Sequence, residues 1–259
     1  MRQNSKGRYV YCVAESGEKC SLGNIGLDNN EVYSISHHDL CAVVHNCPAE
    51  PYSSDEQETV HRWAISHQKV VEAALNRFGT ILPMAFDTIV QDTDEGSAED
   101  NIRKWLAAER DKLKRKLDQV RDKEEYGIQI SWEPKVIAAA ISRTAPDIQK
   151  LEAEISSKSK GLAYMYKQRL GKLLKQEVER EAERCFKDFY IRIKGCVSEV
   201  KVERTKKQED KQMLMNLSCL VPKGETRLLA DELEKIDNMD GFSVHFTGPW
   251  PPYSFVKVD

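Results

Sequence analysis

The sequence lacks the motifs of the common enzyme classes. It contains no G-x-S-x-G nucleophile elbow, no H-E-x-x-H zinc helix, no G-x-x-x-x-G-K-[ST] phosphate loop and no G-x-G-x-x-G after a predicted strand. Its many carboxylates fall on predicted helix faces and in charged loops, where contact with water explains them. We therefore expect no catalytic residue and no cofactor, and we do not expect the chain to be an enzyme.

Cysteine and histidine are present without the spacing of a disulfide framework or a metal site. The seven cysteines are odd in number and include no C-x-x-C pair, so we expect most of them to be small buried apolar side chains. Among the six histidines, only the pair His37 and His38 and the pair His61 and His67 suggest a metal. Six residues on a helix put two side chains on different faces. The histidines are therefore expected on the surface and in turns, with no metal bound.

Long apolar runs are also missing. No segment approaches the roughly 18 apolar residues of a membrane-spanning helix. The first seven residues lead into a short strand-like segment rather than the apolar core of a signal peptide, so a cytoplasmic protein without a membrane partner is expected. The net charge of −3 disfavours bulk electrostatic binding to nucleic acid or to anionic lipid.

What the sequence does contain is enough apolar residues to fold. Hydrophobic residues make up 40% of the 259 positions and charged residues 31%, which is typical of one large or two ordinary domains. Alternating and helical patterns in the first half predict these elements: strand 8–14, a hairpin of strands 32–36 and 40–45, a helix from 53 or 54 to 78, an extended segment 80–90 and a helix 98–123.

The second half predicts a strand at 124–132, a helix at 158–189, strands at 195–203 and 213–221, a helix at 225–235 and a strand at 241–247. This is the β-α-β-β-α-β order of ferredoxin-like domains. We therefore predict an α+β protein with long amphipathic helices and two domains, 1–124 and 125–259. The second is expected to be ferredoxin-like, and the first a modified version of the same plan.

Two segments combine proline with large apolar side chains. One is the segment from Leu82 to Phe86, and the other is the proline-aromatic segment Gly248–Phe255 near the C-terminus. The C-terminal segment either packs across its own domain or is offered to a partner, because proline stiffens the backbone and aromatic rings supply large contact areas. The candidate partner-binding residues are Leu82, Pro83, Phe86, Trp250, Tyr253 and Phe255.

A nucleic-acid-binding regulator is the main alternative. Ferredoxin-like sheets can present aromatic residues to bases, and the strand Gly241–Phe246 carries Phe242 and Phe246. Nine basic and four acidic residues lie between Arg103 and Lys123, which could form a docking patch. The strand stands last instead of third and lacks a leading basic residue, and a helix face in contact with water also explains the charges. A small-molecule enzyme with an unrecognised site is a third alternative.

Several segments together resemble the gas vesicle protein F/L (GvpF/GvpL) family over nearly the whole chain. They are Arg8–Tyr11, Leu40–His45, His67 with Val70–Glu72, Thr80–Phe86, Gly161–Tyr164 and Gly248–Phe255. The Leu-Pro segment and the C-terminal segment are the most specific of these. One departure is that the family usually has Arg-Phe-Gly after Leu-Pro-Met, where this chain has Ala85, Phe86 and Asp87.

The resemblance implies a two-domain α+β accessory or minor structural protein of the gas vesicle, the gas-filled protein shell that gives cells buoyancy. Its implied partners are the hydrophobic major shell protein and other gas vesicle accessory proteins. It would aid nucleation or formation of the shell, and its location would be the gas vesicle within the cytoplasm.

Overall fold

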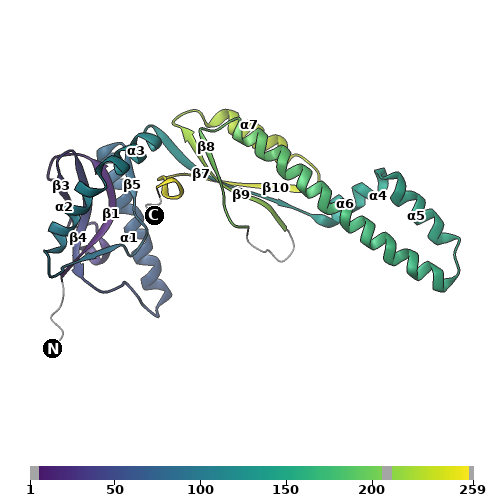
Figure 1. Cartoon of the computed structure of the whole chain (residues 1–259), viewed down its shortest axis with the longest axis horizontal. Helices are drawn as coiled ribbons and strands as arrows, with labels where there is room; N and C mark the ends of the chain where they lie inside the picture. Colours follow the sequence, from purple (N-terminus) through teal and green to yellow (C-terminus); the bar gives the residue numbers. More distant parts are fainter. Residues whose placement is uncertain (1–5, 206–211, 257–259) are drawn as a thin grey trace. The chain divides into compact units, whose positions relative to one another are not determined.

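The structure of the protein is a computed structural model that describes residues 6–205 and 212–256 (Figure 1). The chain contains both helices and strands, and the strands form two sheets, so the predicted α+β class is confirmed. None of the described helices is long and apolar enough to cross a bilayer. Most of the N-terminal stretch on which the signal-peptide expectation rested lies outside the described residues.

The chain divides into two compact units. The first unit extends to Glu125 and includes the chain again from Pro249, whereas the second runs from Tyr126 to Gly248. The sequence predicts a second domain that includes all of 125–259. The structure groups the C-terminal segment with the first unit instead, so the chain leaves this unit and returns to it.

The first unit contains a six-stranded sheet with the order β2-β3-β4-β1-β5, in which β6 also pairs with β1. The strands are β1 (Lys6–Glu15), β2 (Ser21–Gly23), β3 (Val32–His37), β4 (Leu40–Pro48), β5 (Ile81–Pro83) and β6 (Ile89–Gln91). The predicted hairpin is confirmed, because β3 pairs antiparallel with β4 and His38 turns the chain at a φ of 53°. Between β1 and β3 the chain also forms β2 and the 3-10 helix η1 (Leu27–Asn29).

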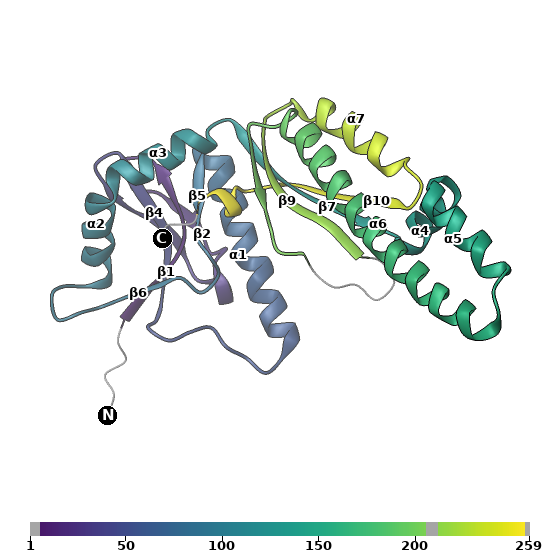
Figure 2. The same cartoon turned by 45° about the vertical axis from the view of Figure 1, so that its right-hand side comes forward.

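Helices contact this sheet on both of its faces (Figure 2). They are α1 (Gln57–Phe78), α2 (Ala98–Ala108) and α3 (Arg110–Val120). Helix α1 ends where predicted, because Gly79 adopts a φ of 77° that glycine tolerates best. The predicted single helix 98–123 is wrong: Glu109 separates α2 from α3. Because β1 has helices on both sides, its residues from Tyr9 to Ala14 are buried.

The second unit contains a four-stranded sheet with the order β10-β7-β9-β8. Its strands are β7 (Lys123–Trp132), β8 (Glu199–Val202), β9 (Gln212–Pro222) and β10 (Phe242–Trp250), and its helices are α4 (Pro134–Thr144), α5 (Pro146–Ser156), α6 (Lys160–Lys194) and α7 (Thr226–Asp237). Helices α6 and α7 lie on the same side of the sheet (Figure 1). Phe189 of α6 and Leu233 of α7 share one core with Ile128 of β7.

Apart from α4 and α5, the order of elements in the second unit is the predicted β-α-β-β-α-β order. The sequence patterns predict no element between the strand at 124–132 and the helix at 158–189, so α4 and α5 are not among the predicted elements. Both helices begin with proline, Pro134 and Pro146. Proline suits the first position of a helix, where its missing N–H is not needed.

Candidate functional site

The Leu-Pro segment, residues 82–86, is mostly part of the first unit's sheet. Leu82 and Pro83 are buried in β5, where they pair with Val13 and Cys12 of β1. Burial on this scale means that neither side chain can meet a partner in the folded protein. Phe86 lies just beyond the strand and is 37% exposed, so it alone keeps the contact role predicted for this segment.

The C-terminal segment, residues 249–256, packs against its own unit. Phe255 is only 2% exposed, and it belongs to the short 3-10 helix η2 (Tyr253–Phe255). The Tyr253 hydroxyl donates a hydrogen bond to Gln68 Oε1 at 3.0 Å. Ser254 donates to Glu125 twice, from its backbone nitrogen at 2.8 Å and from its hydroxyl at 2.6 Å. Tyr253 and Phe255 therefore pack within their own unit, which is the first of the two alternatives for this segment.

Trp250 differs from the rest of this segment. It is the last residue of β10 and its side chain is 46% exposed. Of the three predicted C-terminal contact residues, only Trp250 presents a large aromatic surface to solvent. Together with Phe86 it makes up the candidate contact surface of the first unit, and partner binding by these two residues stays a prediction.

Two fully buried tyrosines organise the interior beneath this surface. Tyr9 and Tyr11 are two residues apart on β1, and each hydroxyl lies against one histidine. The Tyr9 hydroxyl is 2.9 Å from His67 Nδ1, and the Tyr11 hydroxyl is 2.8 Å from His45 Nδ1. Each hydroxyl oxygen also accepts one backbone N–H, from Asp87 and Leu27 respectively.

We assign the proton positions on both histidines from these partners. Each tyrosine oxygen accepts a backbone N–H, and its own hydrogen has the histidine Nδ1 as its acceptor, which favours the tautomer with the ring hydrogen on Nε2. In this tautomer the Nε2 of His45, 3.0 Å from the Tyr52 hydroxyl, is the donor to that hydroxyl. The Nε2 of His67 is buried without a hydrogen bond to any residue described.

Burial controls the ionisation of these groups. Desolvation lowers the pKa of His45 and the pKa of His67 to about 4, so both rings are neutral at pH 7. The nearby backbone of Met84 favours the charged form of His67 but only partly offsets this effect. Burial likewise raises the pKa of Tyr52 to about 12. Burial therefore keeps His45, His67 and Tyr52 in their neutral forms at pH 7.

His67 is also the place where the two predicted segments meet. Its ring centroid lies 5.8 Å from that of Phe86 and 6.5 Å from that of Tyr253. These two residues are 167 positions apart in the sequence. The structure thus brings the Leu-Pro segment and the C-terminal segment to the same histidine.

Two of the histidines are not where the sequence predicts them. His45 is 0% exposed and His67 is 5% exposed, although all six are expected on the surface and in turns. The tyrosine hydroxyls explain the difference, because a neutral imidazole with a hydrogen-bond partner can be buried at modest cost. Tyr9 and Tyr11 are not among the predicted site residues, although their spacing of two on a strand puts both side chains on one face.

The described residues contain no group of three or more histidine, cysteine or acidic side chains that could hold a metal ion. Five of the seven cysteines are buried and none is in a disulfide, which confirms the expectation that most are small apolar core residues.

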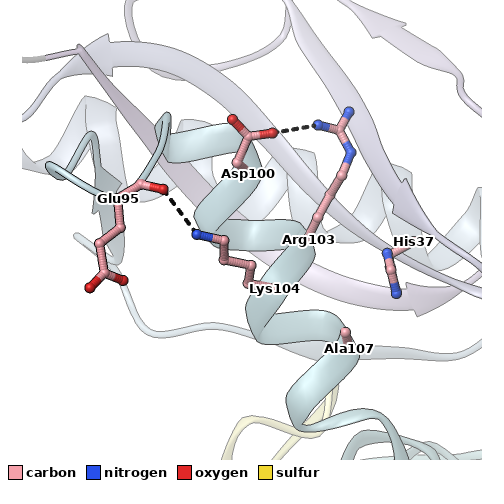
Figure 3. A pocket seen from close by; sticks show the side chains of 6 residues that line it. All are labelled: His37, Glu95, Asp100, Arg103, Lys104 and Ala107. Atoms are coloured by element: carbon pink, nitrogen blue, oxygen red, sulfur yellow. Dashed lines mark hydrogen bonds and ion pairs between the residues drawn. The ribbon is translucent and has the colours of Figure 1, made fainter.

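A separate shallow pocket of about 410 Å³ lies beside α2 (Figure 3). Both cations of the pocket already have partners: Arg103 pairs with Asp100 at 3.6 Å, and Lys104 donates to the backbone oxygen of Glu95 at 3.0 Å. His37 lines the pocket from β3, and the Glu95 carboxylate points away from Lys104 (Figure 3). Neither basic side chain of this pocket is therefore held open for an anionic ligand.

The two features behind the nucleic-acid alternative have structural roles. Phe242 packs edge-on against Phe189 of α6 at 5.2 Å, and Phe246 stacks on Tyr126, a core residue of the second unit, at 5.1 Å. Phe242 thus faces the helices, whereas Phe246 stacks on the neighbouring strand and stays 39% exposed.

Much of the positive charge of 103–123 is neutralised within the protein. Arg110 and Lys114 both donate to Asp39 in the β3–β4 turn, at 2.7 and 2.6 Å, and Arg121 pairs with Glu15 of β1 at 2.8 Å. These contacts hold the pKa of the Asp39 carboxyl well below its usual range. Helix α3 and Arg121, which follows it, are therefore attached to the sheet of their own unit by ion pairs.

Comparison with known proteins gives one consistent family. The model of the family described as gas vesicle synthesis protein GvpL/GvpF matches residues 7–257. The chain is 30% identical to gas vesicle protein L2 of Halobacterium salinarum over 263 residues, which covers 98% of this chain and 92% of that protein. It is 31% identical to gas vesicle protein L of Haloferax mediterranei over 237 residues, covering 89% and 72%.

Solved structures agree on the fold. The crystal structure of the gas vesicle protein GvpF from Anabaena sp. PCC7120 superposes with a TM-score of 0.77 at 22% identity, and the match covers 98% of this chain and 100% of that one. GvpF from Microcystis aeruginosa gives a TM-score of 0.68 at 20% identity, with 97% and 99% covered.

Proposed function

Because this chain belongs to the gas vesicle synthesis protein GvpL/GvpF family, we propose that it is a non-enzymatic accessory protein that binds the hydrophobic major shell protein during gas vesicle assembly. The match over residues 7–257 is the observation that carries this proposal. Membership of the family associates the chain with gas vesicles, and the further step is binding of the shell protein itself.

The physical need for such a protein is clear. A shell subunit with one strongly apolar face aggregates when it is released into water, unless a soluble partner covers that face. Phe86 and Trp250 are suited to this task, because both are large, aromatic and exposed on the first unit. They also belong to neighbouring parts of the unit. Phe86 and Tyr253 both border on His67, and Trp250 precedes Tyr253 by three residues, or at most about 11 Å of chain.

Buried residues of the same two segments support the surface formed by Phe86 and Trp250 from within. Leu82, Pro83 and Phe255 are buried, and the Asp87 backbone that follows Phe86 is held by the Tyr9 hydroxyl at 2.9 Å. A preorganised aromatic contact binds more tightly because less conformational entropy is lost on association. The buried proline and aromatic residues therefore position the exposed ones.

The test is co-purification of the tagged full chain with the major shell protein, with the other gas vesicle accessory proteins present. We expect the wild type to retain the shell protein. The double substitution F86S/W250S is expected to weaken retention about tenfold, because two aromatic contact residues lose their apolar surface. Its thermal melt should stay close to that of the wild type, since both side chains are exposed.

Ile65→Ser is the matched control, because Ile65 is a 56% exposed apolar residue on α1 of the same unit. It should retain the shell protein as the wild type does. Failure of the wild type to retain the shell protein would remove the proposal. Full retention by F86S/W250S would leave shell binding in place and remove these two residues from it.

A further inference from the structure

The second unit carries a helical extension that its core does not require. We name this extension, formed by α4, α5 and residues 160–176 of α6, the helical tip. Helix α6 has 35 residues and is therefore about 50 Å long. Its buried residues Cys185, Phe189 and Ile193 all lie in the second half, where the helix contacts the sheet. The first half reaches beyond the sheet and packs with α4 and α5 (Figures 1 and 2).

Charge is strongly segregated on the helical tip. Nine basic and three acidic residues lie between positions 134 and 176, a net charge of +6 in a chain whose total is −3. From 157 to 176 there are six basic residues and no acidic one. Charges on an ordinary exposed helix alternate in sign. An anionic partner is therefore attracted to this part of the molecule.

Two basic residues of the helical tip lack the ion pairs found elsewhere on the same helix, although Lys175 at the end of the tip pairs with Glu179 at 3.9 Å. In the second half of α6, Arg180, Arg184 and Arg192 each pair with an acidic residue one turn before, at 2.5 to 3.0 Å. In the first half, Arg169 and Lys172 are exposed and form no ion pair with any described residue. Their charge remains available to another molecule.

Large apolar side chains are exposed next to these charges. Leu162 is 50% exposed, Tyr164 is 65% exposed and Met165 is 66% exposed, all within the first two turns of α6. The inward side of the tip is already packed, because Ile148 and Leu151 of α5 are buried there. The three exposed residues are thus outside the core of the tip. An apolar group beside a basic stripe is typical of a protein-docking surface.

We propose that the helical tip is a second docking surface, which binds an acidic amphipathic segment of a partner protein. Its apolar side chains would pack against Leu162, Tyr164 and Met165, and its carboxylates would pair with Arg169 and Lys172. This surface lies in the second unit and is independent of shell-protein binding through Phe86 and Trp250.

The same residues disfavour the other classes of anionic partner. A sugar-phosphate backbone offers little apolar surface against which Leu162 and Met165 could pack. Binding of single-stranded nucleic acid also relies on several aromatic rings that stack on bases, whereas the tip presents one exposed ring, Tyr164, and no sheet. A helix that lies in a membrane interface needs an apolar face along its whole length. Here the exposed side becomes polar after Met165, where Gln168, Arg169 and Lys172 follow.

The experiment measures the fluorescence anisotropy of a labelled peptide of about 18 residues, five helical turns, that carries leucine and glutamate at helical spacing. The full-length protein should bind this peptide, and binding should weaken as salt is raised. R169E/K172E and L162S/M165S should each weaken binding about tenfold or more. K187E/K194E is the matched control, because it changes two exposed lysines in the second half of the same helix, and it should bind as the wild type does.

The alternatives predict different results in this assay and in two further measurements. No binding of the acidic peptide, or equal loss in K187E/K194E and R169E/K172E, would overturn the proposal. Binding of a matched peptide with lysine in place of glutamate would overturn it too, since charge would then not select the partner. Co-sedimentation with phosphatidylglycerol vesicles without peptide binding would assign the surface to a membrane. Self-association that R169E/K172E abolishes, without peptide binding, would assign it to a second copy.

Discussion

Replacing Phe255 by alanine is expected to lower the free energy of unfolding of the first unit by about 3–5 kcal/mol. The side chain is only 2% exposed although it lies near the C-terminus, and truncation would leave a cavity that the neighbouring prolines are too stiff to close. Urea denaturation of the full chain, followed by circular dichroism, measures the loss. The size of the effect matters because small domains are stable by only about 5–15 kcal/mol.

Trp250→Ala is the control for this substitution, because it removes a larger aromatic ring from the same segment at a position that is 46% exposed. It should cost about 1 kcal/mol or less. The reverse order, a large loss for Trp250 and none for Phe255, would contradict the division of this segment into a packed part and a contact part. The pair of variants therefore separates stability from binding within six residues.

Local signals in the sequence predicted most of the fold. Gly79 ended α1, and the turn at His37–Asp39 joined two strands, because these features depend on backbone preferences of a few neighbouring residues. The break at Glu109 was not predictable in the same way. The apolar spacing continues through it, and the separation of α2 from α3 depends on how each helix meets the sheet.

The candidate site could be predicted only in part, because it is assembled by tertiary contacts. Phe86 and Tyr253 were both named from their own segments, yet nothing in either segment shows that both border on His67. The C-terminal segment was assigned to the nearest domain in sequence, whereas its hydrogen bonds to Gln68 and Glu125 attach it to the first unit. Burial also divided the six candidate residues, since sequence alone does not distinguish buried Phe255 from exposed Trp250.

Acid is expected to destabilise the first unit well above the pH at which its carboxylates titrate. His45 and His67 have pKa values lowered to about 4 in the folded protein, against about 6.5 in the unfolded chain. The unfolded state therefore binds more protons between these values, so stability is full above about pH 7 and falls as the pH decreases through 6.5 toward 4. The lowered pKa of each histidine should reduce the free energy of unfolding by about 2 kcal/mol between pH 7.5 and pH 5.

The stability that carboxylate ion pairs supply is lost in a different, lower pH range. The pKa values of Glu15 and Asp39 are lowered by Arg121 and Arg110, respectively, so the stability that these pairs supply is lost only below the normal carboxyl range. Urea denaturation at pH 7.5, 6.5, 5.5 and 5 (values set by the ordinary histidine pKa of about 6.5) therefore isolates the histidine effect.

The His67→Phe variant tests the assignment to this residue. It leaves the Tyr9 hydroxyl without its acceptor and should be less stable than the wild type at pH 7.5, but it should lose about 2 kcal/mol less on acidification. His61→Gln is the matched control, because His61 is exposed on the same helix, and its pH dependence should equal that of the wild type. If the free energy of unfolding of His67→Phe depends on pH as that of the wild type does, protonation of His67 is not the cause of the acid destabilisation. If the pH dependence is smaller, protonation of His67, the residue at which the Leu-Pro segment and the C-terminal segment meet, destabilises the first unit.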